Sequence, residues 1–204
     1  MDLLIIRHGQ SEADILNVIE GRADFELTEL GHRQASQMAA WVKNYIDIDK
    51  IYASTLTRAR QTAEKLSAAL GCPITFDERL MEWNNGLIAG LSRAEADAKY
   101  PRAEKQFLHT ALYGQESTIE FRARAEAVLS EIINENPPDS RIAVVSHGGM
   151  IGHLFRSFLR LPIDTDVGLF SGDTCVHHWK IADMQFHRRN VVFSNSLVHL
   201  REDE

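Results

Sequence analysis

Near its beginning the chain reads Leu3-Leu4-Ile5-Ile6-Arg7-His8-Gly9-Gln10-Ser11, and this stretch decides the fold that we expect for the whole sequence. Four consecutive apolar residues indicate a buried strand, and the strand stops at an arginine, a histidine and a glycine. Ligands of open α/β sheets bind just beyond the carboxyl ends of the strands, so polar residues at this point indicate a site. A guanidinium beside an imidazole favours an anionic, phosphate-like ligand. On this segment alone, a strand end that carries solvated polar residues is an equal alternative.

The same theme returns late in the chain, where the apolar run 142–146 is followed by His147-Gly148-Gly149. Between the two runs, short strands alternate with segments of helical periodicity, which predicts a largely parallel sheet sandwiched between helices. We therefore expect a single domain over 1–204 with a three-layer α/β/α architecture. The individual expectations are strands at 50–54 and 73–76; helices from Thr28, over 59–70, over 118–134 and after His147; and a terminal hairpin of 175–181 and 186–193 that turns near Ala182-Asp183.

This architecture has a consequence for the polar residues. If the strands that end at His8, Ser54 and His147 are parallel neighbours, their carboxyl ends share one edge of the sheet. That edge would gather Arg7, His8, Arg58 and His147 from segments that are distant in sequence.

Composition excludes several classes of function. The 204 residues carry a net charge of −7 with no basic tail, which argues against a nucleic-acid surface. No apolar run is long enough for a secretory signal or a membrane span. Cys72 and Cys175 match neither zinc-ligand spacing nor a disulfide framework. We expect a cytoplasmic protein that needs no metal or cofactor and binds neither nucleic acid nor membrane. The oligomeric state is not predicted.

Five ordered blocks of sequence identify a family. The blocks are Arg7-His8-Gly9; Leu27 to Gly31; Ser54 to Thr62; Glu82 with Gly86 and Gly90; and Ser146 to Gly149. With these blocks the chain resembles the histidine phosphatase superfamily, specifically the phosphoglycerate-mutase-like proteins of branch 1, and the match extends from residue 3 to about residue 180. The resemblance implies the phosphoglycerate-mutase-like fold.

The resemblance implies that His8 is a nucleophile that forms a phosphohistidine intermediate. A neutral imidazole has a free lone pair near pH 7, and neighbouring cations keep it neutral before the substrate arrives. Arg7, Arg58, His147 and Gly148 would bind the phosphoryl group, where preorganised donors lower the barrier to transfer.

Glu82 resembles the proton donor of the family, acting as an acid towards the departing alkoxide and then as a base for water. The adjacent Trp83 would raise the pKa of this carboxyl by desolvation. The alternative is a solvated surface glutamate. The segment 82–115 has no clear periodicity, and we expect an irregular excursion that forms a lid.

The loop after the nucleophile departs from the family. Asp14 stands where an asparagine is common, and a carboxylate there would repel a phosphate dianion unless it were protonated or paired, for example with Arg22. Three alternatives stay open: Asn17 replaces the asparagine, Asp14 faces away, or Asp14 selects an unusual substrate. Gly21 and Arg22 are further candidates for substrate binding, although Arg22 is equally compatible with a surface position.

The expected reaction is the hydrolysis of small phosphorylated metabolites. Mutases of the family carry an insertion after the acid/base glutamate and a pair of arginines for the second anionic group, and neither is present after Glu82. Water should therefore intercept the phosphohistidine. A phosphoglycerate mutase that needs a bisphosphorylated primer is the alternative within the family, and a non-catalytic module that binds phosphorylated ligands is the alternative outside it. The natural substrate is not predicted.

Overall fold

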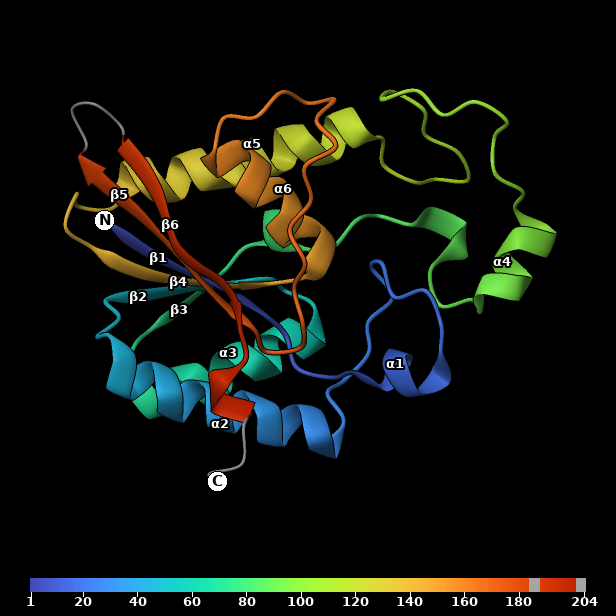
Figure 1. The fold of residues 1–204 in the computed structure, drawn as a ribbon. Coiled ribbons are helices and arrows are strands. Elements are labelled where there is room, and N and C mark those ends of the chain that lie inside the picture. Colours follow the sequence, from blue (N-terminus) through green and yellow to red (C-terminus); the bar gives the residue numbers. More distant parts are fainter. Residues whose placement is uncertain (184–187, 201–204) are drawn as a thin grey trace.

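A six-stranded sheet in the order β3-β2-β4-β1-β5-β6 forms the middle layer of the protein (Figure 1). The computed structural model describes residues 1–183 and 188–200. The predicted α/β class is confirmed by this sheet and by the helices that cover it. The strands are β1 (Asp2–Arg7), β2 (Lys50–Ala53), β3 (Ile74–Phe76), β4 (Arg141–Ser146), β5 (Val176–Asp183) and β6 (Arg188–Ser196).

The strand β1 lies near the centre of the sheet, between β4 and β5. It pairs in parallel with β4, so that Leu3 faces Ile142, and antiparallel with β5, so that Leu3 also faces Trp179. The strands β2 and β3 extend the parallel part beyond β4. The sheet is thus mixed, with four parallel strands and a terminal antiparallel hairpin.

The hairpin differs from its prediction at the turn. The strand β5 continues to Asp183, so Ala182 and Asp183 belong to the strand and not to a turn. Asp183 pairs with Arg188 of β6. This pairing keeps the backbone of β5 extended beyond the apolar residues from which the strand was predicted. Phe186, which we expected in the second strand, and the charged terminal residues 201–204 lie outside the described residues.

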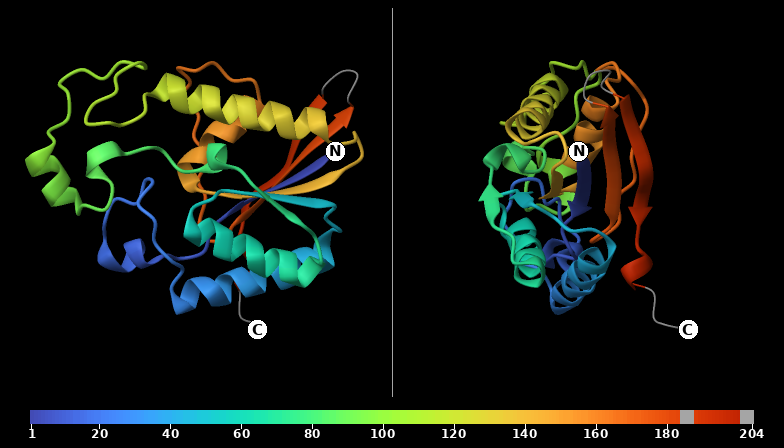
Figure 2. Two further views of the ribbon diagram at one scale, coloured as in Figure 1. Left: turned by 180° about the vertical axis from the view of Figure 1, so that it is seen from behind. Right: turned by 90° about the vertical axis from the view of Figure 1, so that its left-hand side faces the viewer.

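Helices cover both faces of the sheet, as the views in Figure 2 show. Successive side chains of a strand point to opposite faces, and the run that opens the sequence follows this rule. Leu3 and Ile5 pack into the cluster beneath α5 (Thr118–Glu135) and α6 (Gly148–Phe158). Leu4 and Ile6 pack into the cluster beneath α2 (Glu29–Tyr45) and α3 (Thr57–Leu70). The four apolar residues are fully buried because each face has its own helical layer.

The helix ends follow from local sequence. The hydroxyl of Thr28 accepts the N–H of Gly31 at the start of α2, and Gly71 ends α3 in the left-handed conformation. Among the residues that the structure describes, no helix is long and apolar enough to cross a membrane.

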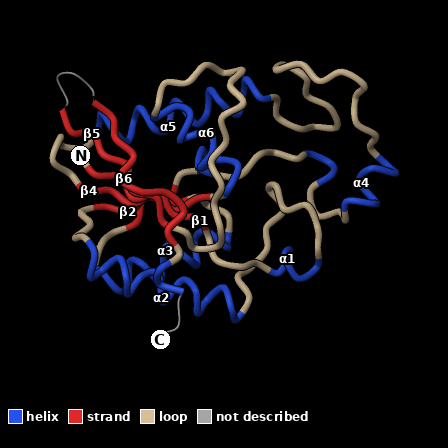
Figure 3. The backbone as a smooth tube through the Cα atoms, viewed as in Figure 1, coloured by secondary structure: helices blue, strands red, loops and turns tan. Residues whose placement is uncertain are grey.

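The loops gather on one side of the sheet, beyond the carboxyl ends of β1, β2 and β4, where they surround two short helices (Figure 3). These helices are α1 (Glu12–Leu16) and α4 (Arg93–Lys99), each preceded by a serine whose hydroxyl and backbone form a capping box. The segment 82–115 is irregular, as expected, and holds one 3-10 turn and α4.

Candidate active site

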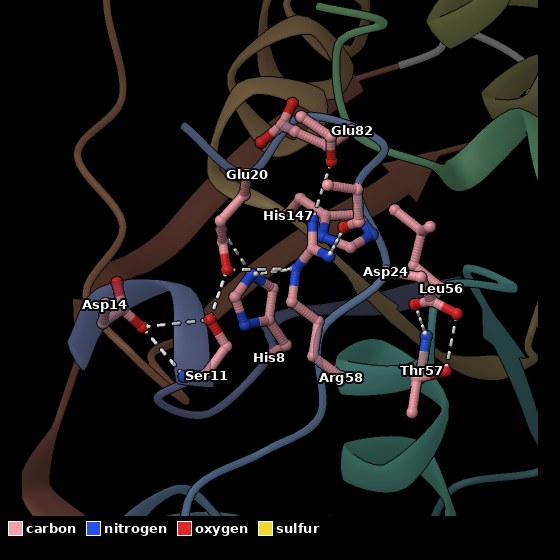
Figure 4. Close-up of polar contacts among 12 residues, drawn as sticks. His8, Ser11, Asp14, Glu20, Asp24, Leu56, Thr57, Arg58, Glu82 and His147 are labelled. Atoms are coloured by element: carbon pink, nitrogen blue, oxygen red, sulfur yellow. Dashed lines mark hydrogen bonds and ion pairs between the residues drawn. The ribbon is translucent and has the colours of Figure 1, made fainter. Parts of the chain in front are cut away.

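Three neighbouring strand ends bring together the polar residues singled out in the sequence. His8 follows β1, His147 follows β4, and Ser54 follows β2, which leads to Arg58 in the first turn of α3. The rings of His8 and His147 lie 5.0 Å apart between centroids, and Arg58 lies beside both (Figure 4). Their side chains are at most 1% exposed. The parallel order of β2, β4 and β1 explains this convergence, because β4 separates the other two strands and places His147 between them.

The backbone fixes the protonation of His8. Its Nδ1 lies 2.8 Å from the carbonyl oxygen of Gly9, which can only accept, so Nδ1 carries the proton and Nε2 the lone pair. The Nε of Arg58 lies 3.3 Å from this Nε2. Burial, followed by the charges of Arg58 and Arg7, lowers the pKa of His8 well below its ordinary value. The imidazole is therefore neutral at pH 7, as a nucleophile requires.

Arg58 is held by bonds to the loop that follows α1. Its two terminal nitrogens donate to the carbonyl oxygens of Gly21, at 2.9 Å, and Ala23, at 3.0 Å. Gly21 has a φ of +49°, and a Cβ there would clash with the amide oxygen of Asn85. Gly21, a candidate for substrate binding, therefore orients the guanidinium of Arg58 through its carbonyl.

His147 and Gly148 form the start of α6. The Nε2 of His147 lies 2.8 Å from the hydroxyl of Ser54, while its Nδ1 is buried without a partner among residues 1–183 and 188–200. Burial, and then the charge of Arg58, lowers the pKa of His147 well below its ordinary value. Gly148 is the first helical residue, so its N–H belongs to the donors that a helix leaves free for an anion.

Arg7 borders the site on the side of β5. One terminal nitrogen donates to the carbonyl oxygen of Ser171 at 2.8 Å, and the other lies 3.2 Å from a carboxylate oxygen of Asp173. Burial raises the pKa of Asp173, and the carboxylates of Asp14 and Glu20 act in the same direction while Arg7 opposes them. The guanidinium of Arg7 is thus oriented by two bonds from the loop before β5.

Glu20 is a member of the site that sequence reasoning missed. Its carboxylate lies 3.8 Å from the Nε2 of His8 and 3.4 Å from the Nε of Arg58, and it also accepts a hydrogen bond from the hydroxyl of Ser11. A carboxylate therefore stands directly before the nitrogen that would attack phosphorus (Figure 4). In the sequence, the one feature that could have indicated Glu20 is its place next to Gly21, a candidate for substrate binding. The surrounding loop has no periodicity from which its position could be predicted.

Glu82 lies on the same side of the histidine pair as Glu20, and the two residues line one cavity (Figure 4). The backbone N–H of Trp83 donates to one carboxylate oxygen at 2.7 Å, and the N–H of Gly149 donates to the other at 2.8 Å. A Cβ on residue 149 would clash with the carboxylate. Gly149, which sequence reasoning did not single out, thus permits the approach of Glu82, whereas Gly148 has open space around it.

An ion pair supports the backbone of the Glu82 loop. Arg124, on α5, donates to the carbonyl oxygens of Arg79 and Met81, both at 2.7 Å, and of Glu82 at 3.2 Å. It also donates to the carboxylate of Glu116 at 2.6 Å. Sequence reasoning missed this pair, because Arg124 is one of four charged residues in the first half of α5 and nothing in the sequence distinguishes it from the others.

Arg22 joins that support and does not pair with Asp14. Its Nε donates to the carbonyl oxygen of Glu82 at 3.4 Å, and a terminal nitrogen lies 3.8 Å from Glu116. Asp14 instead accepts the backbone N–H of Ser11 at 2.8 Å and so caps α1. Asn17 is exposed and ends α1 in the left-handed conformation, with a φ of 52°. Asp14 is thus held at the start of α1 and also lines the cavity beside Glu20, so the choice among the three alternatives for this loop stays open.

A cavity of about 470 Å³ adjoins Glu20 and Glu82 and extends towards α4 and α5. Within the described parts of the chain, no group of three histidine, cysteine or acidic side chains is placed to hold a metal ion.

The sequence matches the histidine phosphatase superfamily (branch 1) over residues 3–192, and the chain belongs to that family. The relatives of this chain include enzymes named as phosphatases. Glucosyl-3-phosphoglycerate phosphatase of Mycobacterium tuberculosis (strain ATCC 25618 / H37Rv) is 34% identical over 171 residues, which cover 79% of this chain and 76% of the relative. Probable phosphoglycerate mutase GpmB of Escherichia coli (strain UTI89 / UPEC) is 33% identical over 166 residues, with the same coverage of 79% and 76%.

Solved structures agree with this placement. A mycobacterial glucosyl-3-phosphoglycerate phosphatase complexed with VO3 superimposes with a TM-score of 0.82 at 29% identity, covering 96% of this chain and 99% of the other. Bacillus stearothermophilus YhfR superimposes with a TM-score of 0.84, covering 98% and 99%, and at 24% identity it bears on the fold alone. The recognition of the family from the five sequence blocks is confirmed.

Proposed function

We propose that this phosphatase hydrolyses phosphate monoesters of small metabolites in two steps through a phosphohistidine on His8. In the first step Nε2 forms a bond to phosphorus, the P–O bond of the ester breaks, and protonated Glu82 gives its proton to the departing alkoxide. In the second step Glu82 takes a proton from water, the water oxygen bonds to phosphorus, and the P–N bond breaks. The product is inorganic phosphate, and His8 and Glu82 return to their initial states.

The observation that carries this proposal is the orientation of His8. Its Nδ1–H is bound by Gly9, so that the lone pair of Nε2 faces the guanidinium of Arg58 at 3.3 Å. Charge on the transferring phosphoryl oxygens would be stabilised by Arg58, Arg7, the free Nδ1 of His147 and the N–H of Gly148. Removing one such donor typically lowers the rate by about a hundredfold or more.

The residues around Glu82 favour hydrolysis over the mutase reaction, in which the phosphoryl group moves between two positions of one substrate. A mutase must hold a second anionic group beside the acid/base carboxylate, and the nearby guanidiniums of Arg22 and Arg124 are bound to Glu116 and to backbone carbonyls. The first relative described above is named a phosphatase, whereas the name of the second suggests the mutase reaction.

The proposal also covers the domain organisation of the protein, its cellular compartment and its need for cofactors. We expect one domain over 1–204, in which the segment 82–115 acts as a lid, in a cytoplasmic enzyme that needs no cofactor or metal. The net charge of −7 supports the absence of a nucleic-acid partner.

The test is the hydrolysis of 4-nitrophenyl phosphate in the presence of EDTA by the wild type and by His8→Ala. We expect turnover by the wild type alone, together with an acid-labile phosphoprotein in quenched samples. Equal rates would end the role of His8, and phosphate binding without turnover would favour a binding module. Conversion of 3-phosphoglycerate with a bisphosphorylated primer faster than phosphate release would favour the mutase.

A further inference from the structure

The cavity of about 470 Å³ beside Glu82 lies where the alcohol part of a substrate would extend from the reacting phosphorus. Its wall has an acidic side near the phosphoryl group and an aromatic side further away. The acidic side holds Asp14, Glu20 and Glu82, and the aromatic side holds Trp83, Phe121 and His153. The acidic side restricts the charge of the alcohol that the cavity can bind, and the aromatic side restricts its shape.

The charges of the cavity disfavour an anionic alcohol. Among the described residues that line it, Arg93 is the only cation, and it is an exposed residue at the start of α4. Arg22, which would otherwise be the nearest partner for a carboxylate, donates to the backbone of Glu82 and pairs with Glu116. A carboxylate on the leaving group would enter beside Glu20 and Glu82 without a buried counter-charge, which costs free energy.

The three carboxylates are held in place by donors of the protein itself. Asp14 is bound by Ser11, Glu20 by Ser11 and Arg58, and Glu82 by the N–H groups of Trp83 and Gly149. They keep their negative charge, so the selection that they impose is directed against anionic alcohols.

The aromatic side offers the partly exposed ring of Trp83 and one unused polar group. Phe121 contacts Trp83 edge-on at 5.0 Å between centroids and His153 at 4.5 Å. His153 is 8% exposed, its Nδ1 is buried without a partner, and no hydrogen bond reaches its Nε2 from the part of the chain that the structure describes. Burial lowers the pKa of His153 to about 4, so the ring is neutral and has one donor and one acceptor.

The position of His153 along α6 places it within reach of a substrate. It lies four residues after Gly149, on the same face of the helix and roughly 6 Å further along its axis. Since Gly149 binds the carboxylate of Glu82, a six-membered ring that starts at the ester oxygen would span the distance to His153.

We propose that this cavity binds the leaving group and selects phosphate monoesters of hydroxyl-bearing alcohols that carry no negative charge and have a flat apolar face, such as aromatic or sugar alcohols. The ring of the alcohol stacks on the partly exposed Trp83, and its distal hydroxyl forms a hydrogen bond with His153. The preference in hydrolysis depends on the proposed phosphatase reaction, whereas the preference in binding depends on the cavity alone.

The experiment compares 4-(hydroxymethyl)phenyl phosphate with 4-carboxyphenyl phosphate, which have the same outline and differ in charge. We expect kcat/KM to be about tenfold higher for the hydroxymethyl ester, with most of the difference in KM. Similar or better use of the carboxylate ester would overturn the selection, although the proposed hydrolysis would stand. Affinities of the same two esters for His8→Ala, measured by calorimetry, should differ in the same direction, and equal affinities would overturn the proposal even if neither ester were hydrolysed.

His153→Phe tests the role of the imidazole, since a phenyl ring keeps the packing on Phe121 and removes both nitrogens. The ratio of kcat/KM for the hydroxymethyl ester to that for unsubstituted phenyl phosphate should fall about fivefold. His153→Gln, which restores a donor and an acceptor, should recover part of the ratio. The matched control is His109→Phe, at an exposed histidine of the excursion. An unchanged ratio in His153→Phe, or an equal fall in His109→Phe, would contradict the assignment.

Discussion

The two ends of the site are built in different ways. At the phosphoryl end, His8 and His147 follow adjacent strands and Arg58 starts a helix, and these side chains are at most 1% exposed. At the end of the leaving group, Glu82 is half-buried on an irregular segment, and its position depends on the pair of Arg124 and Glu116. The sheet thus fixes the positions of His8, His147 and Arg58, whereas a supported loop fixes Glu82, the proposed proton donor, and the shape of the cavity.

The largest effect should come from the phosphoryl end. Arg58→Ala removes a phosphoryl donor and leaves the carbonyls of Gly21 and Ala23 without their partner, so we expect kcat/KM to fall by at least about a hundredfold. Arg58→Lys should recover little, because an ammonium cannot reproduce the planar fork that bonds both carbonyls. Steady-state kinetics with 4-nitrophenyl phosphate, alongside circular dichroism of each variant, makes this measurement. Full rescue by lysine would show that charge alone matters at this end.

At the other end, Arg124→Gln should displace Glu82 without touching substrate. We expect kcat to fall about tenfold or more with a smaller change in KM, because misplacement of a catalytic group penalises the chemical step. The basic limb of the pH–rate profile should also move, which a purely structural defect would not cause. A double variant, Arg124→Gln with Glu116→Gln, separates stability from activity. Breaking a largely buried ion pair leaves one charge without its partner, so the double variant should regain part of the free energy of unfolding that the single variant loses. Its kcat should stay low, because Glu82 still lacks the support of Arg124. Unchanged kcat in the single variant would remove Arg124 from the positioning of Glu82.

A smaller effect is expected where the two ends meet, at Glu20. Because its carboxylate lies 3.4 Å from Arg58 and 3.8 Å from His8, it competes with an incoming phosphate for the same cation. Glu20→Gln should tighten inhibition by inorganic phosphate about tenfold, while Glu12→Gln, at an exposed position of α1, serves as the control of equal charge change. Asp14→Asn should have a smaller effect than Glu20→Gln, since Asp14 is bound to Ser11. An unchanged inhibition constant for Glu20→Gln would place Glu20 outside the phosphoryl site.

The smallest effect concerns acid stability. His153, His177 and His199 each have a pKa lowered by burial to about 4, against an ordinary value of 6.5. Between these values each of the three imidazoles binds more protons in the unfolded chain than in the native one. Their joint contribution to stability therefore falls as the pH is lowered from 6.5 towards 4 and changes little below that pH. Thermal melts should show a Tm several degrees lower at pH 4.5 than at pH 7, with a shallower dependence in His153→Phe. A Tm that stays constant over this range would contradict the burial of these neutral rings.

The phosphoryl end could be largely predicted from the sequence, and the reason is its regular backbone. An apolar run followed by His8, and another followed by His147, needs only parallel pairing to bring the two rings together. The same reasoning placed Arg58, because the first turn of a helix after a neighbouring strand lies at the same edge.

The opposite end could not be predicted to the same depth. Glu20, Glu116 and Gly149 acquire their roles from contacts across 9, 8 and 67 positions, respectively, to Ser11, Arg124 and Glu82. No periodicity reports such contacts in loops, and a glutamate bound to a buried arginine looks like a surface glutamate in sequence. The same limit led to the open alternatives for Asp14 and Arg22, whose partners are Ser11 and Glu116.

The central place of β1 in the sheet has a consequence for synthesis of the protein. Both hydrogen-bonding edges of β1 are filled by strands that come much later in the sequence, β4 from residue 141 and β5 from residue 176. A nascent chain that has emerged only as far as α5 therefore carries the strand leading to His8 without either neighbour. Closing such long sequence separations is entropically slow, so His8 reaches its final environment only after β5 has been made.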